Sequence, residues 1–198
     1  MELSANPLTR DELWERNQYL IEFQQATDAY TLQPDPLIFT DVLRQRHDLI
    51  DKFGFAIPNA PALELIAQHA PIVELGAGCA YWASLLQASG VEVVPIDKHP
   101  QVNAWTDVLS GEVKDLDAYP HHTLMMIWPP LENPMAKDAL RTYKGDYLLY
   151  VGESADGCCA DPGFFDNLHQ DWRLLANIRI PAWPLIHDSL FLYMRKPT

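Results

Sequence analysis

Two glycines, Gly76 and Gly78, separate a short apolar run from a run of residues typical of a helix. Glycine lets the backbone turn tightly and approach a ligand closely, and the free N–H groups at a helix start face such a ligand. About twenty residues later Asp97 ends a second apolar run, where its carboxylate is placed to accept hydrogen bonds from ribose hydroxyls. The spacing predicts a nucleoside site. A plain strand–helix connection and a helix N-cap at Asp97 are the structural alternatives.

Two classes of ligand share this geometry, dinucleotides and S-adenosylmethionine. A dinucleotide site has a third glycine where this chain has Tyr81, so that the helix packs closely on the strand beside a pyrophosphate. Glu74 stands just before the glycines, where a carboxylate repels a pyrophosphate but suits a cationic amino-acid ligand. Both residues favour S-adenosylmethionine, and an NAD-dependent oxidoreductase is the weaker alternative.

Residues 74–78, Glu-Leu-Gly-Ala-Gly, with an acidic residue ending the next strand, resemble motifs I and II of the class I S-adenosylmethionine-dependent methyltransferases. The resemblance covers roughly residues 59–196 and implies their fold and cofactor. It implies that the turn lines the methionine end and that Asp97 holds the ribose. It also implies, through Gly-Glu-Val at 111–113, that Glu112 contacts the adenine amino group. The residues expected on the cofactor are Glu74, Gly76, Ala77, Gly78, Tyr81, Asp97, Glu112 and Trp128.

The segment Trp128-Pro129-Pro130-Leu131 ends the fourth predicted strand, where the resembling fold places its substrate-facing motif. Many amino-group methyltransferases carry Asp or Asn, two prolines and an aromatic residue there, and carbonyl oxygens accept the N–H bonds of the substrate. Here Trp128 removes the side-chain acceptor. We expect Trp128 to form an aromatic wall beside the sulfonium, with transfer achieved by in-line positioning, although the prolines alone explain the strand end. The residues expected on the acceptor side are Trp128, Pro129, Tyr81 and Glu153.

Several residues have two readings of similar weight. Glu112 and Glu153 are explained equally well as solvated loop acids, because each follows a predicted strand end. Residues 53–58, Phe-Gly-Phe-Ala-Ile-Pro, fit either a lid over the cofactor or an aromatic packing segment. His187 and Asp188 precede the last predicted strand, and neighbours in a strand point to opposite faces, which favours unpaired turn residues over an acid–base pair.

Other site classes are disfavoured by spacing. Cys158 and Cys159 are adjacent, near Asp161 and His169, and lack the C-x₂₋₄-C spacing of zinc sites, so we predict no metal site. There is neither a G-x-S-x-G elbow nor a P-loop, which excludes the common hydrolases and NTPases.

The elements that position these residues alternate after a helical start. A capping box at Thr9–Glu12 begins the first helix, and the Pro-rich residues 181–184 are too short for a helix, so the strands beside them should pair antiparallel. Helices are predicted over about 10–30, 36–53, 59–70, 81–89 and 135–143. Strands are predicted over 71–75, 91–97, 106–110, 123–128, 146–151, 172–180 and 189–195.

This order predicts an α/β protein with a Rossmann-like methyltransferase fold. Its sheet should have seven mostly parallel strands with an antiparallel C-terminal hairpin strand. Residues 1–58 should form a helical extension or lid, and residues 59–198 the cofactor-binding domain, within one compact unit.

Composition limits the partners and the compartment. The 198 residues are 48% hydrophobic and 21% charged, as in one globular domain, without a membrane-length apolar stretch. Fourteen basic residues face 27 acidic ones, a net charge of −13 that disfavours nucleic acids and anionic membranes. Three cysteines and no secretory signal indicate a reducing cytoplasm.

The sequence therefore predicts a cytoplasmic methyltransferase that uses S-adenosylmethionine and acts on a small molecule or an exposed protein side chain. Acidic charge favours a neutral or cationic acceptor. A catalytically silent binding or interaction module on the same fold is the main alternative, because fold alone does not establish activity. The sequence names neither a general base nor an oligomeric state.

Overall fold

The computed structural model describes Trp14 and residues 17–197. The first part is a pair of helices, α2 (Gln18–Leu32) and α3 (Pro36–Phe53). Asn17 caps α2 by accepting a hydrogen bond from Leu20 N, and Asp35 caps α3 in the same way from Leu37 N. The predicted bounds of α3 are confirmed. The capping box at Thr9–Glu12 lies outside the described residues.

An alternating α/β unit follows. Asn59, at the predicted start of the first helix, caps it by accepting a hydrogen bond from Ala62 N at 3.1 Å. The helices of this unit are α4 (Ala60–Ala67), α5 (Tyr81–Ala88), the 3₁₀ helix η1 (Val113–Ala118), α6 (Met135–Thr142) and α7 (Pro162–Asp171). The strands are β1 (Ile72–Leu75), β2 (Val93–Asp97), β3 (Leu109–Ser110), β4 (Thr123–Ile127), β5 (Tyr147–Gly152), β6 (Trp172–Arg179) and β7 (Ser189–Arg195).

The strands form one seven-stranded sheet in the order β3-β2-β1-β4-β5-β7-β6. β1 lies at the centre of the parallel part, between β2 and β4, and only β7 runs antiparallel to its neighbours. The predicted fold class and the C-terminal hairpin are confirmed. Because the strand order reverses beside β1, the carboxyl ends of β1, β2 and β4 border the crevice in which such sheets bind ligands.

Two apolar layers enclose the sheet. Alternate strand residues, such as Ile72 and Val73 of β1, point to opposite faces. One face packs against α4 and α5, and the other against η1, α6 and α7. The two core layers hold β1 and the turn that follows it rigidly in place.

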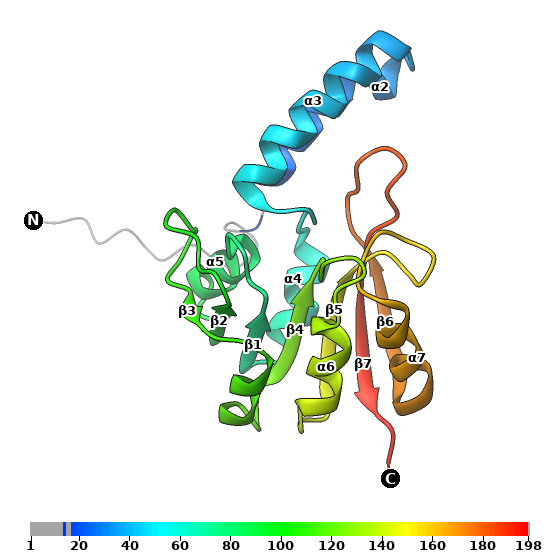
Figure 1. The fold of residues 1–198 in the computed structure, drawn as a ribbon. Helices are drawn as coiled ribbons and strands as arrows, with labels where there is room; N and C mark the ends of the chain where they lie inside the picture. The colour runs from blue at the N-terminus through cyan, green and yellow to red at the C-terminus, as the bar shows by residue number, and fades with distance from the viewer. Residues whose placement is uncertain (1–13, 15–16, 198) are drawn as a thin grey trace, which may run out of the picture.

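The helices α2 and α3, here called the arm (residues 18–53), run antiparallel and project beyond the edge at which the parallel strands end (Figure 1). Only the base of the arm packs on the sheet domain. There Tyr19 and Phe53 join a third buried cluster with Ile57, Tyr81 and Trp183. The arm therefore meets the sheet domain close to the turn between β1 and α5.

Two helices were not predicted from the sequence. α7 begins at Pro162, after Asp161 whose side chain accepts a hydrogen bond from Gly163 N at 2.9 Å. η1 begins after Glu112 with a capping box between Glu112 and Asp115. Both starts carry ordinary capping signals. Among the described residues, no helix is long and apolar enough to cross a membrane.

Candidate active site

The turn between β1 and α5 has the backbone conformation that the glycine pair predicts. Gly76 and Gly78 have positive φ angles of 73° and 52°. The N–H groups of Gly76 and Ala77 donate to the carbonyl of Ile96 at 2.9 and 3.1 Å, which fixes the turn on β2. A Cβ atom added at Gly76 would lie 3.2 Å from Cε of Met135. Both the φ angle and the close approach of Met135 therefore favour glycine at position 76.

A cavity of about 910 Å³ opens over this turn, at the carboxyl ends of the parallel strands. Its size lies in the range of sites that hold a cofactor-sized ligand. The cavity is lined by these residues expected on the cofactor: Glu74, Gly76, Ala77, Gly78, Tyr81, Asp97, Glu112 and Trp128. The structure thus brings together the whole predicted cofactor set.

Glu74 is an acid without a partner in this cavity. Its side chain is 2% exposed, and its buried Oε2 has no hydrogen-bond partner among the described residues. Burial, with a smaller contribution from the charge of Asp97, raises the pKa of Glu74 to about 8. A buried carboxyl group without a partner would be stabilised in its ionised form by a cationic ligand in the cavity.

Asp97 binds the backbone at the end of β2. Its Oδ2 accepts a hydrogen bond from Gly78 N at 2.9 Å and its Oδ1 accepts one from His99 N at 2.7 Å. It does not cap a helix, which was the alternative interpretation. Asp97 connects the two strand ends that border the cavity while its side chain lines the cavity wall.

Glu112 lies at the far end of the cavity in a charged cluster. Its carboxylate is 2.9 Å from Nζ of Lys114 and 3.5 Å from Nζ of Lys98. These lysines, Lys114 first, lower the pKa of Glu112, and its backbone N–H donates to Oδ2 of Asp115. Glu112 therefore combines an exposed ion pair with a place in the cavity lining.

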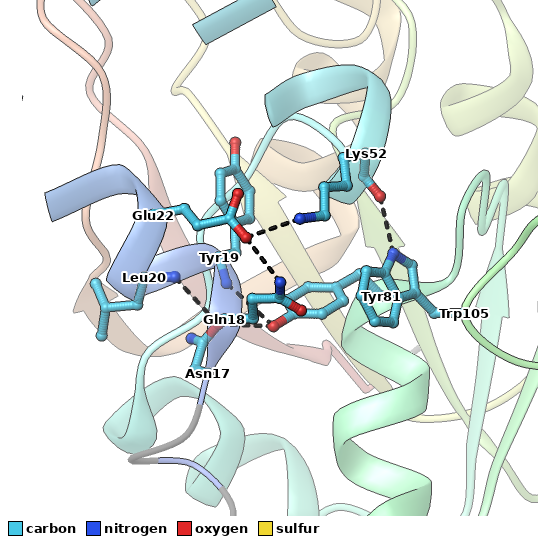
Figure 2. Close-up of polar contacts among 8 residues, drawn as sticks. All are labelled: Asn17, Gln18, Tyr19, Leu20, Glu22, Lys52, Tyr81 and Trp105. Carbon is cyan, nitrogen blue, oxygen red and sulfur yellow. Dashed lines mark hydrogen bonds and ion pairs between the residues drawn. The ribbon is translucent and has the colours of Figure 1, made fainter. Parts of the chain in front are cut away.

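Tyr81 and Trp82, the first residues of α5, are both buried core residues and both line the cavity. Trp82 donates a hydrogen bond from its indole nitrogen to the carbonyl of Ala56 at 3.1 Å. The Tyr81 hydroxyl lies between Oδ1 of Asn17 and the backbone N–H of Tyr19 (Figure 2). Both side chains therefore connect α5 to segments that precede the sheet.

The loop after β2 also contacts the arm. Trp105 donates a hydrogen bond from its indole nitrogen to the carbonyl of Lys52 at 2.8 Å (Figure 2). Its ring stacks on Phe53 with centroids 5.3 Å apart. Residues of the arm and the segment after it also line the cavity, namely Ile50, Asp51, Phe53, Gly54, Phe55 and Ala56.

Trp128 follows β4 in a left-handed conformation, with φ of 49°. Its backbone N–H donates to Val151 O at 2.8 Å, and its indole Nε1 donates to Oδ1 of Asp188 at 2.9 Å. The sequence favours turn residues over an acid–base pair here, and among the described residues Asp188 forms no ion pair with His187. Asp188 is nevertheless not unpaired, because it is bonded to Trp128. Asp188 is 4% exposed, and burial, ahead of the charge of Glu153, raises its pKa to about 7.

Two residues expected on the acceptor side lie outside the cavity lining. Pro129 is buried, and its carbonyl accepts a hydrogen bond from Ala160 N at 2.8 Å. Glu153 is 5% exposed, and its carboxylate accepts hydrogen bonds from His187 N at 3.0 Å and Cys158 N at 2.9 Å. It is not a solvated loop acid, because it holds two loops together behind Trp128.

The cysteines near β5 have different surroundings. Cys158 is exposed and Cys159 is buried. Within the described part of the chain, no group of three or more His, Cys, Asp or Glu residues is arranged to hold a metal ion.

The fold is similar to that of several solved structures. One is 1,6-didemethyltoxoflavin-N1-methyltransferase of Burkholderia thailandensis with S-adenosylhomocysteine (16% identity, TM-score 0.54, 81% of this chain and 88% of that one). Another is magnesium protoporphyrin IX methyltransferase of Synechocystis PCC 6803 with bound SAM (6%, TM-score 0.50, 99% and 100%). A third is MtNAS in complex with MTA and tNA (12%, TM-score 0.50, 98% and 92%).

No protein-family model matches the sequence, and no curated protein sequence matches it. At these identities, the likeness to solved structures concerns the fold. The sheet order and the antiparallel β7 agree with the architecture that the sequence motifs predict. The chain therefore has the Rossmann-like fold of the class I S-adenosylmethionine-dependent methyltransferases.

Proposed function

We propose that this protein is an S-adenosylmethionine-dependent methyltransferase that acts on a small molecule. The observation that carries the proposal is the convergence of the glycine turn, Glu74 and Asp97 on one cavity at the carboxyl ends of β1 and β2. A cavity of about 910 Å³ is large enough for a nucleoside cofactor and a small second ligand.

The residues present fit the cofactor. Glu74 supplies a buried carboxyl for the cationic methionine end, and its Oε2 has no hydrogen-bond partner among the described residues. The positive φ angles of Gly76 and Gly78 bring the backbone close to that end. Asp97 would accept hydrogen bonds from the ribose hydroxyls, because its carboxylate oxygens have further lone pairs beyond those used for its backbone contacts. Glu112 would face the adenine.

The cofactor supplies a methyl group on a positively charged sulfur. The lone pair of the acceptor forms the new bond to the methyl carbon, and the sulfur keeps the electron pair of the old bond. An acceptor that carried a proton at the reacting atom releases that proton to solvent. The protein's part is to hold the two reactants in line and to exclude water. Trp128, at the end of β4, would form the wall beside the reacting centre, with Pro129 and Glu153 supporting it from outside the cavity.

The N-terminal extension would serve as a lid. Ile50, Phe53 and Phe55, from the end of α3 and the segment after it, line the side of the cavity opposite the sheet. Because this segment follows the arm and lines the cavity, it would cover bound ligands. We assign residues 1–58 to the lid and residues 59–198 to the cofactor-binding domain.

Calorimetric titration tests the proposal. The purified protein is titrated with S-adenosylmethionine, S-adenosylhomocysteine and, as a control ligand, NAD. We expect the first two to bind in the micromolar range and NAD not to bind. Asp97→Ala should weaken binding more than tenfold, on the order of 1.4 kcal/mol or more, whereas Asp107→Ala, an exposed acid in the following loop, should leave it unchanged. Failure of both adenosyl ligands to bind would contradict the proposal.

A second candidate function is a binding module without methyl transfer. Its support is Trp128, because an indole has no acceptor oxygen for a substrate amine, and its N–H is already bonded to Asp188. Binding of S-adenosylmethionine without methylated product across a broad panel of amines, phenols and heteroaromatic compounds would favour this candidate. Methylated product detected by mass spectrometry would exclude it.

A further inference from the structure

We propose that the methyl acceptor is a flat aromatic or heteroaromatic molecule, neutral or cationic, that stacks on a platform formed by Phe55 and Trp128. This inference rests on the proposed function, and it narrows the acceptor from small molecules in general to one shape and charge. It also makes Asp188 a positioning residue, because Asp188 holds one half of the platform.

The platform consists of two rings that stack on each other, so a ligand can stack on an outer face of the pair. The ring centroids of Phe55 and Trp128 are 4.8 Å apart and the planes are 11° from parallel. Both residues line the cavity. Phe55 is 46% exposed, whereas the neighbouring Phe53 is 1% exposed. An aromatic residue that only filled the core would be buried like Phe53, so Phe55 presents surface on which a further ring can stack.

Trp128 is held in place from two directions. Its left-handed φ of 49° is strained for a bulky residue, and such strain persists where the surrounding structure requires one orientation. The hydrogen bond from Nε1 to Asp188 fixes the indole ring at the start of β7. Three separate segments therefore meet at the platform: the segment after α3, the end of β4 and the start of β7.

The charges of the cavity limit what can stack there. Two acidic residues of its lining, Asp51 and Asp138, are not used by the proposed cofactor, and the basic side chains of the lining are Lys98 and His99. Lys98 lies at the opposite end, beside Glu112. Arg46 of α3 is near enough to lower the pKa of Asp188 but does not line the cavity. An anionic acceptor would therefore meet repulsion, whereas a cationic ring gains from both the acids and the aromatic faces.

Ligand-observed NMR titration of the complex with S-adenosylhomocysteine tests the inference with four probes. Isoquinoline and 4-aminoquinoline are flat and respectively neutral and cationic, 2-naphthoate is flat and anionic, and decahydroisoquinoline is cationic but saturated. We expect 4-aminoquinoline to bind about tenfold more tightly than either of the last two. The inference would be overturned if decahydroisoquinoline bound as tightly as 4-aminoquinoline or if 2-naphthoate bound more tightly than 4-aminoquinoline. It would also be overturned if neither isoquinoline nor 4-aminoquinoline bound.

Variants locate the probe. Phe55→Leu keeps an apolar side chain but removes the ring, and we expect it to weaken 4-aminoquinoline binding about tenfold while S-adenosylhomocysteine affinity changes less than about twofold. Phe39→Leu, an aromatic substitution in α3 whose ring contacts Tyr30, is the matched control and should change neither. Unchanged probe binding in Phe55→Leu would overturn the platform.

Asp188 is tested by a conservative pair. Asp188→Asn keeps an oxygen that accepts the Trp128 hydrogen bond and should retain the preference for flat over saturated probes. Asp188→Ala should lose that preference with S-adenosylhomocysteine affinity retained. If both variants keep the preference, Asp188 does not position the platform. If the unmodified protein did not bind S-adenosylhomocysteine, the proposed function itself would be refuted. Failure of the proposed function is therefore distinguishable from failure of the platform.

Discussion

The hydroxyl of Tyr81, at the first position of α5, donates a hydrogen bond to Oδ1 of Asn17, 64 residues earlier in the chain, at 3.0 Å. The same hydroxyl accepts a hydrogen bond from Tyr19 N at 3.2 Å. Both contacts are buried. The helix that starts directly after the glycine turn is thus joined to the first residues of the arm by one side-chain oxygen.

Tyr81→Phe removes this oxygen. The N–H of Tyr19 then loses its bond to the hydroxyl, and Oδ1 of Asn17 keeps only the bond from Leu20 N. Because unpaired buried polar groups are costly, we expect the free energy of unfolding to fall by about 1–3 kcal/mol. Urea denaturation measures the change. Tyr30→Phe, a hydroxyl deletion on α2 away from the sheet domain, is the control and should have little effect. A Tyr81→Phe variant as stable as the unmodified protein would show that these bonds contribute nothing net.

Gly76→Ala and Gly90→Ala form a matched pair, because both glycines have positive φ angles, 73° and 79°. The strain of placing alanine in this region should destabilise both variants by about 1–2 kcal/mol. A Cβ at Gly90 meets nothing within 4 Å, whereas one at Gly76 lies 3.2 Å from Met135 at the cavity. We expect only Gly76→Ala to lose affinity for S-adenosylmethionine, as measured by calorimetry. Equal loss in both would indicate a global effect.

The raised pKa of Glu74 predicts a pH dependence of stability. Its pKa rises from 4.5 in the unfolded chain to about 8 in the folded protein, so the folded state binds a proton more tightly. The contribution to stability is complete below about pH 4.5 and is lost as pH rises through about 8. Asp188 acts in the same direction, with a folded pKa of about 7.

We therefore expect Tm to fall between about pH 5 and pH 8.5, and Glu74→Gln to reduce that slope. Differential scanning fluorimetry across this range measures it. Glu64→Gln, an exposed acid on α4, is the control and should keep the slope of the unmodified protein. A slope that Glu74→Gln leaves unchanged would show that Glu74 ionises normally in the folded protein.

Cofactor binding should release a proton from Glu74. The positive charge of S-adenosylmethionine near the carboxyl favours its ionised form, so binding at about pH 7 should expel up to about one proton per cofactor. Titrations in phosphate and in Tris, which have very different ionisation enthalpies, should give different binding enthalpies. The difference should vanish in Glu74→Gln. A difference that survives in that variant would assign the proton to another group.

Local signals predict most of the sheet domain. Asn59, Gly76 and the prolines at 181–184 each set one backbone feature without help from the rest of the chain, and the helix start, turn and hairpin follow them in the structure. β3 is shorter than predicted, with only Leu109 and Ser110 paired to β2. Both residues are exposed at the sheet edge, where no buried face fixes a longer register.

The acceptor side depends on contacts between distant residues. Asp188 meets Trp128 across 60 residues, and Phe55 reaches the same indole from the segment after α3. Neither pairing leaves a local pattern in the sequence. α7 is different, because its start has a local signal. Asp161 followed by Pro162 is a recognisable helix start, and this pair predicts a helix from residue 162.

Trp183, in the loop between β6 and β7, donates a hydrogen bond to the Tyr19 hydroxyl across 164 residues, and Tyr19 in turn donates to the carbonyl of Gly54. During synthesis, the Trp183 bond to Tyr19 cannot form until residue 183 has left the ribosome, so the segment that carries Phe55 lacks this support until then. Contacts at such long sequence separation form late because the intervening chain must first lose its freedom. The residues that line the cavity all lie before residue 139, so the last support of the Phe55 segment comes from a part of the chain made after the cavity lining itself.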